Sequence, residues 1–554
     1  MSKNIVIIGG VAGGMSAATR ARRLDESARI TVLEAGGFVS FANCGLPYHI
    51  AGRIKDESAL LVTTPKRIAD RFNIDVRTQT RAVRIDRSTR TVHAVHAGEE
   101  QVFAYDVAVI ATGAAAIVPA IAGATAPNVL TLRSMEDTRR MQELLGRGGV
   151  RRVVVVGGGF IGLEMAEALT DRKLDVTLIE KNGQVLPPLD AEMAALVELE
   201  LRAHGVNVVT GTGLGRLVGG AEGVTGVETE DGRLFPADLV LLSIGVRPNV
   251  ELARGAGLMI GATGGIAVDG WQRTSDPAIL AVGDATEVVN GVTRGFARVP
   301  LGGPANRQGR VAGTVAGGGA VPRDSQPVAG TVMGTAIVQV FSLSAGLTGL
   351  TEKAAVAAGI AHETAVITAS HHASYYPGAH PLRVKLVYEP GSGKLLGAQV
   401  AGRDGVDKRL DVLATVLHFG GTVEDLARLD LAYAPQFGSA KDPLHMAAFV
   451  AENQLAGVVK TVRVIPPEAL PLDVRSAAEF AGGSLPGAIN IPLEELRRRA
   501  SELPRDRAVV TFCQIGQRGY VAYRILHQLG FTRLANLEGG YVVAALVPLG
   551  AGAH

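Results

Sequence analysis

Two stretches of the chain share one order of apolar and polar positions. The first runs NIVIIGGVAGGMSAATRARR and continues to ARITVLEAG; the second is RRVVVVGGGFIGLEMAEALTDRKLDVTLIEKNG. Each begins with a run of β-branched residues, which favours a buried strand. A glycine-rich turn, a helix with small residues near its start, and a second strand ending in glutamate follow. Each stretch therefore predicts a βαβ unit.

The glycines of the second unit have the spacing that a dinucleotide requires. Gly157 allows a tight turn, Gly159 lets backbone approach a pyrophosphate, and Gly162 lets the helix pack on the strand. The helix N-terminus offers free N–H groups to the phosphates. Glu180 can accept hydrogen bonds from a ribose 2′-OH and repels a 2′-phosphate, so NADH is favoured. Lys181 weakens this preference, and NADPH stays open as a donor.

The first unit departs from this spacing. Its turn reads GGVAGG, with Val11 at the position of the second glycine, while Glu34 still ends the second strand. An α/β domain without a ligand is the alternative interpretation for this unit. The rest of the chain argues against that alternative.

Three later segments support a pair of nucleotide-binding units. A strand in YDVAVIATGAAAIVPAIAG runs into Ala111, Thr112 and Gly113, where the chain crosses from one nucleotide domain to the next. PADLVLLSIGVRPNV repeats that pattern and includes Gly245. In TSDPAILAVGDATEV, Asp284 follows a strand and Gly283, so its carboxylate can hold a ribityl hydroxyl of FAD; an ordinary turn is the alternative.

Composition narrows the classes of protein. A chain of 554 residues suggests three or four domains, and 70 glycines with 47% hydrophobic residues suit a loop-rich α/β protein. The net charge of +2 and the lack of a basic block disfavour nucleic acid as a partner. Two cysteines argue against a secreted disulfide framework. The N-terminus reads as a buried strand and no apolar run spans a membrane, so we expect a cytoplasmic protein.

The order of these motifs resembles the flavin- and NAD-linked disulfide reductases built on the glutathione reductase plan. The resemblance covers about residues 1–450. It implies a homodimer and a helix near the flavin that starts in 300–313. We expect an FAD domain at 1–149 and 246–324, an NAD(P)H domain at 150–245, and an interface domain at 325–450. The resemblance implies that FAD binds to Gly9, Gly10, Ala12, Gly13, Gly14, Glu34, Ala111, Thr112, Gly113, Gly245, Gly283, Asp284 and Pro300, and NADH to Gly157, Gly159, Phe160, Ile161, Gly162 and Glu180.

The stretch FVSFANCGLPY contains Cys44 without a second cysteine nearby. It resembles the single-cysteine branch of that family, which comprises coenzyme A disulfide reductases, NADH oxidases, NADH peroxidases and persulfide reductases. The resemblance implies that Cys44 faces the flavin. Only a thiolate attacks a disulfide or persulfide, so the site must lower the pKa of Cys44, by a helix N-terminus or by the flavin. A small buried apolar role is the alternative.

Two further features discriminate within this branch. Oxidases and peroxidases of the branch carry a histidine in the first glycine loop, where this chain has Ala12. HHASYYPGAHPL and LAYAPQFGSAKDP resemble segments that bring tyrosines to the coenzyme A disulfide reductase site from the opposite subunit. Tyr433 matches one segment, and Tyr375, favoured over Tyr376, matches the other. A phenol there can supply a proton to a departing thiolate; packing at a dimer interface is the alternative.

After a linker at 451–460, residues 461–554 resemble a rhodanese domain. Cys513 follows the strand VVTF and opens a loop before an amphipathic helix. Four residues separate Cys513 from Arg518, one fewer than in arginine-capped phosphatase loops, which suits a sulfane sulfur. Asp473 and Arg475 match the Asp-Val-Arg that braces the loop, and Ser484 stands where a histidine is frequent. An inactive domain used for docking is the alternative.

The sequence thus predicts an α/β fold with two Rossmann-like domains for FAD and NAD, an α+β dimerisation domain, and a C-terminal α/β rhodanese domain. The expected activity is an FAD-dependent NAD(P)H:coenzyme A disulfide or persulfide reductase with a sulfurtransferase domain. Coenzyme A is its substrate or bound ligand. An NADH oxidase or peroxidase that cycles Cys44 through a sulfenic acid is the alternative enzyme, and a redox-sensing scaffold the non-enzymatic one. No metal site is expected, since His371, His372 and His380 give no convincing ligand spacing.

Overall fold

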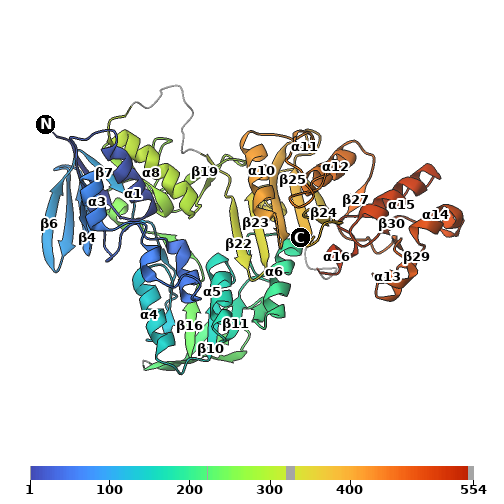
Figure 1. Ribbon diagram of the computed structural model, residues 1–554, viewed down its shortest axis with the longest axis horizontal. Coiled ribbons are helices and arrows are strands. Elements are labelled where there is room, and N and C mark those ends of the chain that lie inside the picture. The colour runs from blue at the N-terminus through green and yellow to red at the C-terminus, as the bar shows by residue number, and fades with distance from the viewer. Residues whose placement is uncertain (1, 221, 320–330, 547–554) are drawn as a thin grey trace. The chain divides into compact units, whose positions relative to one another are not determined.

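The computed structural model describes residues 2–220, 222–319 and 331–546 (Figure 1). The chain divides into two compact units, Met1–Gly183 with His204–Gly334, and Gln184–Ala203 with Thr335–His554. The predicted boundary between residues 324 and 325 falls outside the described residues, and the four predicted domain ranges stay predictions. No helix of the described residues is both long enough and apolar enough to cross a membrane.

The first unit contains two parallel five-stranded sheets in which four strands have the same order, β7-β1-β2-β3 and β16-β10-β11-β12. In the first sheet, order β18-β7-β1-β2-β3, the strands are Ile279–Ala281, Val107–Ile110, Asn4–Ile8, Arg29–Leu33 and Asp75–Arg77. In the second sheet, order β12-β11-β10-β16-β9, they are Asn207–Thr210, Asp175–Glu180, Arg152–Val156, Leu239–Leu242 and Val129–Leu130. This duplication confirms the two predicted βαβ units.

Helices cover these sheets because small residues line the contacts. The helix α1 (Ala12–Arg22) lies against α8 (Gly302–Ala316), which is the helix expected from 300–313. A Cβ on Gly309 would lie 2.2 Å from the carbonyl oxygen of Gly13, so the backbones meet at this point. The second sheet carries α5 (Phe160–Asp171) and α4 (Met135–Gly146). The short helices α2 (Leu46–Ile50), α3 (Pro65–Phe72) and α7 (Glu251–Gly255) complete this unit's helices.

Smaller sheets connect the two nucleotide-binding folds. The strand β8 (Ala114–Ala116) directly follows the crossing segment predicted at 111–113, and it pairs with β17 (Val246–Pro248), which lies within the second such segment, PADLVLLSIGVRPNV. Antiparallel sheets of β4 (Thr80–Asp86), β5 (Thr91–His96) and β6 (Glu99–Ala104), and of β13 (Leu214–Gly220), β14 (Gly223–Thr229) and β15 (Leu234–Pro236), extend each fold. A further sheet joins β19 (Val288–Asn290), β20 (Phe296–Ala297) and β21 (Thr331–Val332).

The second unit begins with an antiparallel sheet, order β22-β23-β26-β25-β24. Its central strands β25 (Pro381–Tyr388) and β26 (Leu395–Gly402) are buried almost throughout and mostly apolar, apart from the buried Arg383, Lys385 and Gln399. The outer strands are β22 (Ala336–Val340), β23 (Leu343–Gly349) and β24 (Glu363–Ser370). The helices grouped with this sheet are α6 (Ala191–Ala203), α9 (Glu352–Ala357), α10 (Val406–His418), α11 (Val423–Ala427) and α12 (Pro443–Leu455).

The same unit ends in a parallel sheet, order β27-β31-β30-β28-β29. Its strands are Thr461–Val462, Leu534–Leu537, Val509–Phe512, Leu470–Asp473 and Ile489–Asn490. Four buried residues form β30, as the VVTF pattern predicts, and α15 (Gln517–Gln528) follows it. The remaining helices are α13 (Ala477–Ala481), α14 (Leu493–Arg499) and α16 (Tyr541–Ala544). The predicted α/β fold class is confirmed.

Candidate functional site

The first glycine turn joins β1 to α1 at the carboxyl edge of the sheet. Gly9 has φ +107°, and a Cβ on Gly14 would lie 1.9 Å from the carbonyl oxygen of Gly9, so neither position accepts a side chain. Val11 precedes the helix, and among the described residues no side chain caps it. The first N–H groups of α1 therefore remain available to a phosphate. Ala12 is the first helical residue, and Gly10 and Gly13 complete the turn.

Glu34, at the end of β2, is fixed beside this turn. Its two carboxylate oxygens accept hydrogen bonds from the N–H groups of Gly10 and Gly36, each at 2.7 Å. The acid thus stands one strand away from the phosphate-binding turn, where a ribose hydroxyl of a bound dinucleotide lies. These residues fit the adenosine half of FAD.

The second glycine turn repeats this geometry. Gly157 also has φ +107°, and a Cβ on Gly162 would lie 1.9 Å from its carbonyl oxygen. A Cβ on Gly159, in contrast, would meet no heavy atom within 4 Å, so the backbone is open where Phe160 and Ile161 begin α5. Glu180 is buried and accepts from the N–H of Gly158 at 2.7 Å. This turn fits a pyridine dinucleotide.

Other predicted flavin residues gather at the same edge of the first sheet. β7, which ends at Ile110, and β18, which ends at Ala281, are neighbours, so the stretch Ala111–Gly113 and Asp284 follow adjacent strands. Asp284 forms an ion pair with Arg133, with 3.1 Å between Nη2 and Oδ2. Arg133 was not predicted from the sequence.

The remaining predicted residues are held by local contacts. The Thr112 hydroxyl donates to the Asn249 carbonyl at 2.7 Å, and the Gly283 N–H donates to the side chain of Gln308. Gly113 and Gly245 have positive φ, and Pro300 is exposed.

Cys44 lies in the 3₁₀ turn Asn43–Gly45 and is exposed. Its sulfur is 3.7 Å from Oδ1 of Asn43. The surrounding protein desolvates the thiol and raises its pKa, Glu164 and Asp284 raise it further, and Arg133 lowers it. The short helix α2 follows this turn. The two sources of a lowered pKa considered from the sequence, a helix N-terminus and the flavin, stay predictions.

Glu164, which sequence reasoning missed, reaches this region from α5. Its Oε1 accepts a hydrogen bond from the Tyr48 hydroxyl at 2.9 Å. Burial raises the pKa of Glu164, and the Tyr48 hydrogen bond only partly offsets that effect. Burial therefore favours the protonated form of this carboxyl relative to that of an exposed one. The helix of the second glycine turn thus contributes a titratable group to the surroundings of Cys44.

The predicted tyrosines lie together in the second unit. The hydroxyl oxygens of Tyr375 and Tyr433 are 3.2 Å apart, and both side chains are exposed. Their hydrogen bond raises the pKa of Tyr375. Tyr376 instead lies edge-on to His372, with ring centroids 5.6 Å apart. The geometry pairs Tyr433 with Tyr375, the residue that the spacing favoured.

Cys513 opens the loop between β30 and α15 and is buried, with 1% of its surface exposed. Among the described residues, no hydrogen bond uses the backbone N–H groups of Gln514, Ile515 or Gly516. These donors and the start of α15 form a cradle for an anion. Arg518 lies close enough to Cys513 for the sulfur to raise the pKa of the guanidinium, although the larger cause is its hydrogen bonding to Glu479.

Two acidic residues brace this loop. Glu479 binds Arg518 through two hydrogen bonds of 2.8 and 2.6 Å. Asp473 is fully buried and pairs with Arg475 at 2.7 Å, and Arg475 donates to Oε1 of Gln514 in the loop. Ser484 Oγ donates to Asp473 at 2.7 Å, so serine supplies a hydrogen bond to the brace where a histidine is frequent. The Ser-x-x-Glu capping pattern of α13 was the signal that locates Glu479.

Comparison with known proteins follows the same division of the chain. Family models match at residues 3–307, described as pyridine nucleotide-disulphide oxidoreductase, at 335–443, its dimerisation domain, and at 463–544, a rhodanese-like domain. Reduced Bacillus anthracis CoADR-RHD is 42% identical, with 99% of each chain covered and a TM-score of 0.94. An NAD-dependent persulfide reductase from A. fulgidus is 42% identical, with 98% of this chain and 99% of that chain covered and a TM-score of 0.92.

A curated relative extends the comparison beyond the solved structures. The NAD(P)H coenzyme A polysulfide/persulfide reductase of Pyrococcus horikoshii is 36% identical over 451 residues, 81% of this chain and 98% of its own. Proteins named NADH oxidase are also among the relatives. The first family model alone spans more than half of the sequence. This chain therefore belongs to the pyridine nucleotide-disulphide oxidoreductase family.

Proposed function

We propose that this protein is an FAD-dependent NADH:coenzyme A disulfide and persulfide reductase with its own sulfurtransferase domain. The observation that carries the proposal is that the chain has two cysteines, each in a separate site. Cys44 is exposed beside the flavin-binding edge, and Cys513 is enclosed in a cradle of backbone N–H groups. Two solved structures, named CoADR-RHD and NAD-dependent persulfide reductase, match both parts of the architecture, and a relative named NAD(P)H coenzyme A polysulfide/persulfide reductase matches 81% of the chain.

The residues of the first unit hold the cofactors. The turn at Gly9–Gly14, Glu34 and Asp284 hold FAD, while the turn at Gly157–Gly162 and Glu180 hold NADH. When bound, FAD takes a hydride from NADH and supplies the two electrons that return Cys44 to its thiolate. Both carboxylate oxygens of Glu180 accept hydrogen bonds from backbone or amide donors around the turn, which holds the side chain in place to accept from a 2′-hydroxyl.

An ion pair of Lys181 supports the preference for NADH over NADPH. Lys181, adjacent to Glu180, was expected to weaken the repulsion of a 2′-phosphate. Its Nζ is 3.0 Å from Oε1 of Glu230, so its charge is already paired. NADH is thus the donor that Glu180 favours, and NADPH is the weaker one.

Cys44 carries the chemistry on sulfur. Its thiolate attacks the inner sulfur of coenzyme A persulfide, a mixed disulfide forms between Cys44 and coenzyme A, and sulfide leaves with the electron pair of the broken S–S bond. With coenzyme A disulfide the same attack expels a coenzyme A thiolate instead. Glu164, whose pKa is raised by burial, is placed to hold the proton exchanged in this step. Tyr375 and Tyr433 protonate the departing thiolate at the Cys44 site of the opposite subunit of a cytoplasmic homodimer.

Cys513 supplies persulfide sulfur. Its thiolate attacks the outer sulfur of a sulfane donor, the S–S bond of the donor breaks, and the rest of the donor leaves with the electron pair. The loop N–H groups and Arg518 stabilise the persulfide anion that forms. A coenzyme A thiolate then attacks the outer sulfur of this persulfide, and Cys513 leaves as its thiolate. The intact cysteine, arginine and brace favour an active domain over a docking module. The NADH oxidase alternative has less support, because Ala12 stands where a histidine serves oxygen or peroxide chemistry.

The test is anaerobic NADH consumption with coenzyme A persulfide or coenzyme A disulfide, in wild type, Cys44→Ser and Cys513→Ala. We expect both acceptors to be reduced, sulfide to appear with persulfide, and Cys44→Ser to be inactive with either. Cys513→Ala keeps the reduction of ready-made coenzyme A persulfide and loses sulfur transfer from a donor. A Cys44→Ser enzyme that still turns over persulfide, or a wild type that consumes NADH only when oxygen is admitted, contradicts the proposal.

A further inference from the structure

A five-residue segment after β31 closes over the loop of Cys513. This 538–542 segment contains Gly540, where φ is +66° and an added Cβ would lie 2.5 Å from the carbonyl oxygen of Cys513. The N–H of Tyr541 donates to that same carbonyl at 2.8 Å, and the N–H of Val542 donates to the carbonyl of Gln514 at 3.1 Å. The position of this segment therefore fixes the first two residues of the sulfur-carrying loop.

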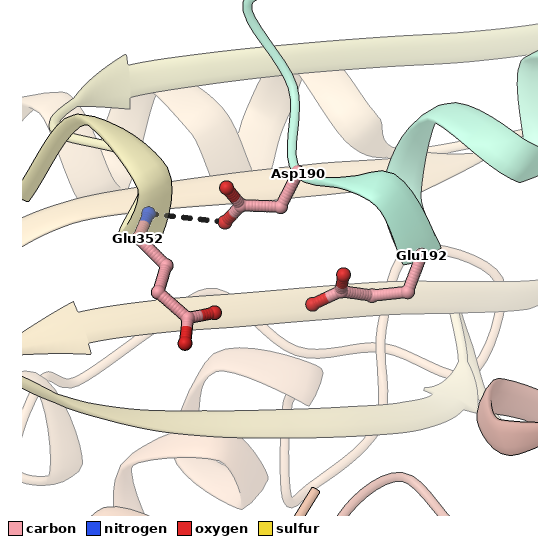
Figure 2. A group of neighbouring side chains, drawn as sticks. All are labelled: Asp190, Glu192 and Glu352. Carbon is pink, nitrogen blue, oxygen red and sulfur yellow. Dashed lines mark hydrogen bonds between the residues drawn. The ribbon is translucent and has the colours of Figure 1, made fainter. Parts of the chain in front are cut away.

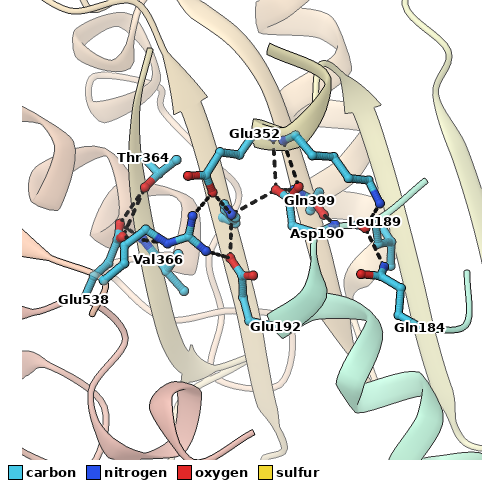
Figure 3. A network of polar contacts seen from close by, with 12 residues as sticks. Gln184, Leu189, Asp190, Glu192, Glu352, Thr364, Val366, Gln399 and Glu538 are labelled. Carbon is cyan, nitrogen blue, oxygen red and sulfur yellow. Dashed lines mark hydrogen bonds and ion pairs between the residues drawn. The ribbon is translucent and has the colours of Figure 1, made fainter. Parts of the chain in front are cut away.

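The other side of the 538–542 segment contacts the antiparallel sheet of the same unit. The Glu538 carboxylate is buried and accepts hydrogen bonds from β24, from the Thr364 hydroxyl at 3.1 Å and the Val366 N–H at 3.0 Å. At the far end of the segment, Arg383 of β25 donates to the carbonyl of Val542 at 3.5 Å. Figure 3 shows Glu538 directed at Thr364 and Val366. The sheet of the dimerisation domain thus holds both ends of the segment.

A buried charge cluster anchors this contact. Asp190, Glu192 and Glu352 direct carboxylate oxygens toward one another, all within 4.8 Å (Figure 2). The ammonium of Lys385 occupies that position, at 2.9, 2.5 and 2.6 Å from the three acids, and it is fully buried. The cation that three acids require is therefore a side chain of the protein, and the cluster is structural.

Arg463 connects this cluster to Glu538. It comes directly after β27, pairs with Glu352, lies 3.0 Å from Glu192, and has its Nε 3.9 Å from Oε2 of Glu538. Burial raises the pKa of Glu538 to about 7, although Lys385 and Arg463 oppose the shift. The direct hydrogen-bond partners of Glu538 lie on β24. Truncation of the Glu538 side chain therefore leaves the Val366 N–H and the Thr364 hydroxyl without their acceptor.

We infer that Glu538 is a positioning residue for sulfur transfer, through which the dimerisation sheet sets the conformation of the Cys513 loop. The inference rests on the proposed function of Cys513 as a sulfur carrier. The chain of contacts is continuous: β24 holds Glu538, Glu538 holds the 538–542 segment, and that segment binds the carbonyls of Cys513 and Gln514. With both carbonyls held outward, the neighbouring N–H groups face the sulfur.

The experiment uses the full chain carrying Cys44→Ser, in which Cys513 is the one remaining cysteine. Thiosulfate is the sulfur donor. The Cys513 thiolate attacks its outer sulfur, an S–S bond forms to Cys513, the S–S bond of thiosulfate breaks, and sulfite leaves with the electron pair. Mass spectrometry measures the rate of persulfide formation, and iodoacetamide measures the accessibility of the same thiol. The variants are Glu538→Ala, Glu538→Gln and Thr364→Val.

We expect the two measurements to move in opposite directions. Glu538→Ala loads sulfur at least tenfold more slowly, because the anion cradle is lost, and is alkylated faster, because the buried thiol opens. Glu538→Gln keeps an acceptor for the Val366 N–H and lies between the two. Thr364→Val removes the hydroxyl that donates to Glu538 and is expected to slow sulfur loading as well. The slowing of sulfur loading in the double variant Thr364→Val/Glu538→Gln is expected to be smaller than the sum of the two single effects, because both changes act on the same hydrogen bond.

Two controls separate positioning from general loss of stability. Glu468→Ala removes an exposed acid of the same domain and is expected to match wild type. Leu496→Ala creates a cavity in the core of the domain, and below its unfolding temperature it is expected to load sulfur normally. NADH-driven reduction of coenzyme A disulfide, measured with Cys44 restored, is expected to be unchanged by Glu538→Ala.

The failure of the inference is distinct from the failure of the proposed function. If Glu538→Ala loads sulfur and is alkylated at the rates of Glu468→Ala, the inference is overturned. If loading slows equally in Glu538→Ala, Glu538→Gln and Leu496→Ala, the role of Glu538 is general stability and the inference is also overturned. If the Cys44→Ser parent accepts no sulfur while alkylation still differs among the variants, the positioning role stands and the sulfurtransferase proposal fails.

Discussion

Replacement of Lys385 by methionine is the sharpest test of how the second unit is held together. The ammonium lies within 3 Å of three carboxylates, and Lys385, Asp190 and Glu192 are all buried. Methionine keeps most of the side-chain volume and removes the charge. Loss of one partner from a buried ion pair costs about 3–5 kcal/mol, because the remaining charges stay desolvated. At neutral pH we expect a loss of this size in the stability of β24–β26.

Hydrogen exchange of the backbone N–H groups measures this loss locally. A global melting curve is unsuitable, because a chain of several domains does not unfold in two states. A loss of about 3–5 kcal/mol corresponds to exchange about two to three and a half orders of magnitude faster in β25. The control is Lys394→Met, which removes an exposed lysine from the turn before β26 and is expected to change stability by less than about 0.5 kcal/mol.

The pH dependence of stability is a second, independent test of the role of Lys385. Burial raises the pKa of Asp190, but the ion pair with Lys385 outweighs it and holds the pKa below the ordinary value of 3.8. This acid therefore stabilises the wild type above pH 3.8, and that contribution is lost as the pH falls through its lowered pKa. In Lys385→Met the hydrogen bonds from Gln399 and the Glu352 backbone remain, but without the ammonium we expect burial to raise the folded pKa above 3.8, so that stability increases as the pH falls toward 4. The two proteins converge at acidic pH.

Two results refute this reasoning. Exchange in Lys385→Met as slow as in Lys394→Met at pH 7 would mean that the cluster is solvated or that its acids are already protonated. A difference between Lys385→Met and wild type that stays constant from pH 7 to pH 4 would mean that lost packing, and not uncompensated charge, causes the loss.

The remaining predictions concern the two sites. In kcat/KM measurements with both donors, Glu180→Ala lowers the preference for NADH over NADPH by at least tenfold, because the 2′-phosphate is no longer repelled. Gly159→Ala changes the stability that hydrogen exchange reports in β10 by less than about 0.5 kcal/mol, because its Cβ meets open space, and raises the KM for NADH, because that Cβ covers the backbone that the pyrophosphate approaches. Gly162→Ala also lowers this stability, because its Cβ would lie 1.9 Å from the Gly157 carbonyl oxygen. Glu479→Gln weakens the hold on Arg518 and slows persulfide formation from thiosulfate severalfold, and equal rates in wild type and variant would show that Arg518 needs no orientation.

Local sequence patterns predicted the parts of each site that lie next to one another in the chain. Each glycine turn lies in a single βαβ unit together with Glu34 or Glu180, and the Cys513 loop joins one strand to the helix that follows it. In each case a few neighbouring residues dictate the backbone. Partners distant in sequence were not predicted. Arg133 meets Asp284 across 151 residues, and Tyr48 meets Glu164 across 116. A single charged residue on a helix looks the same whether it faces solvent or another domain, so these pairs need the fold.

The helix α6 shows why the deepest feature of the second unit leaves no trace in the sequence. Its position between β11 and β12 follows the order of a nucleotide-binding unit, yet residues 184–203 group with the second unit. Asp190 and Glu192 precede and open this helix, where acids ordinarily complement the helix dipole at the surface. The strand β25 turns them inward, because its ammonium group at Lys385 is fully buried and needs anions around it. Arg463 and Glu538 extend this network of charges to the rhodanese sheet. The cluster therefore joins segments from three regions of the chain, although the sequence around its acids looks like that of an ordinary surface.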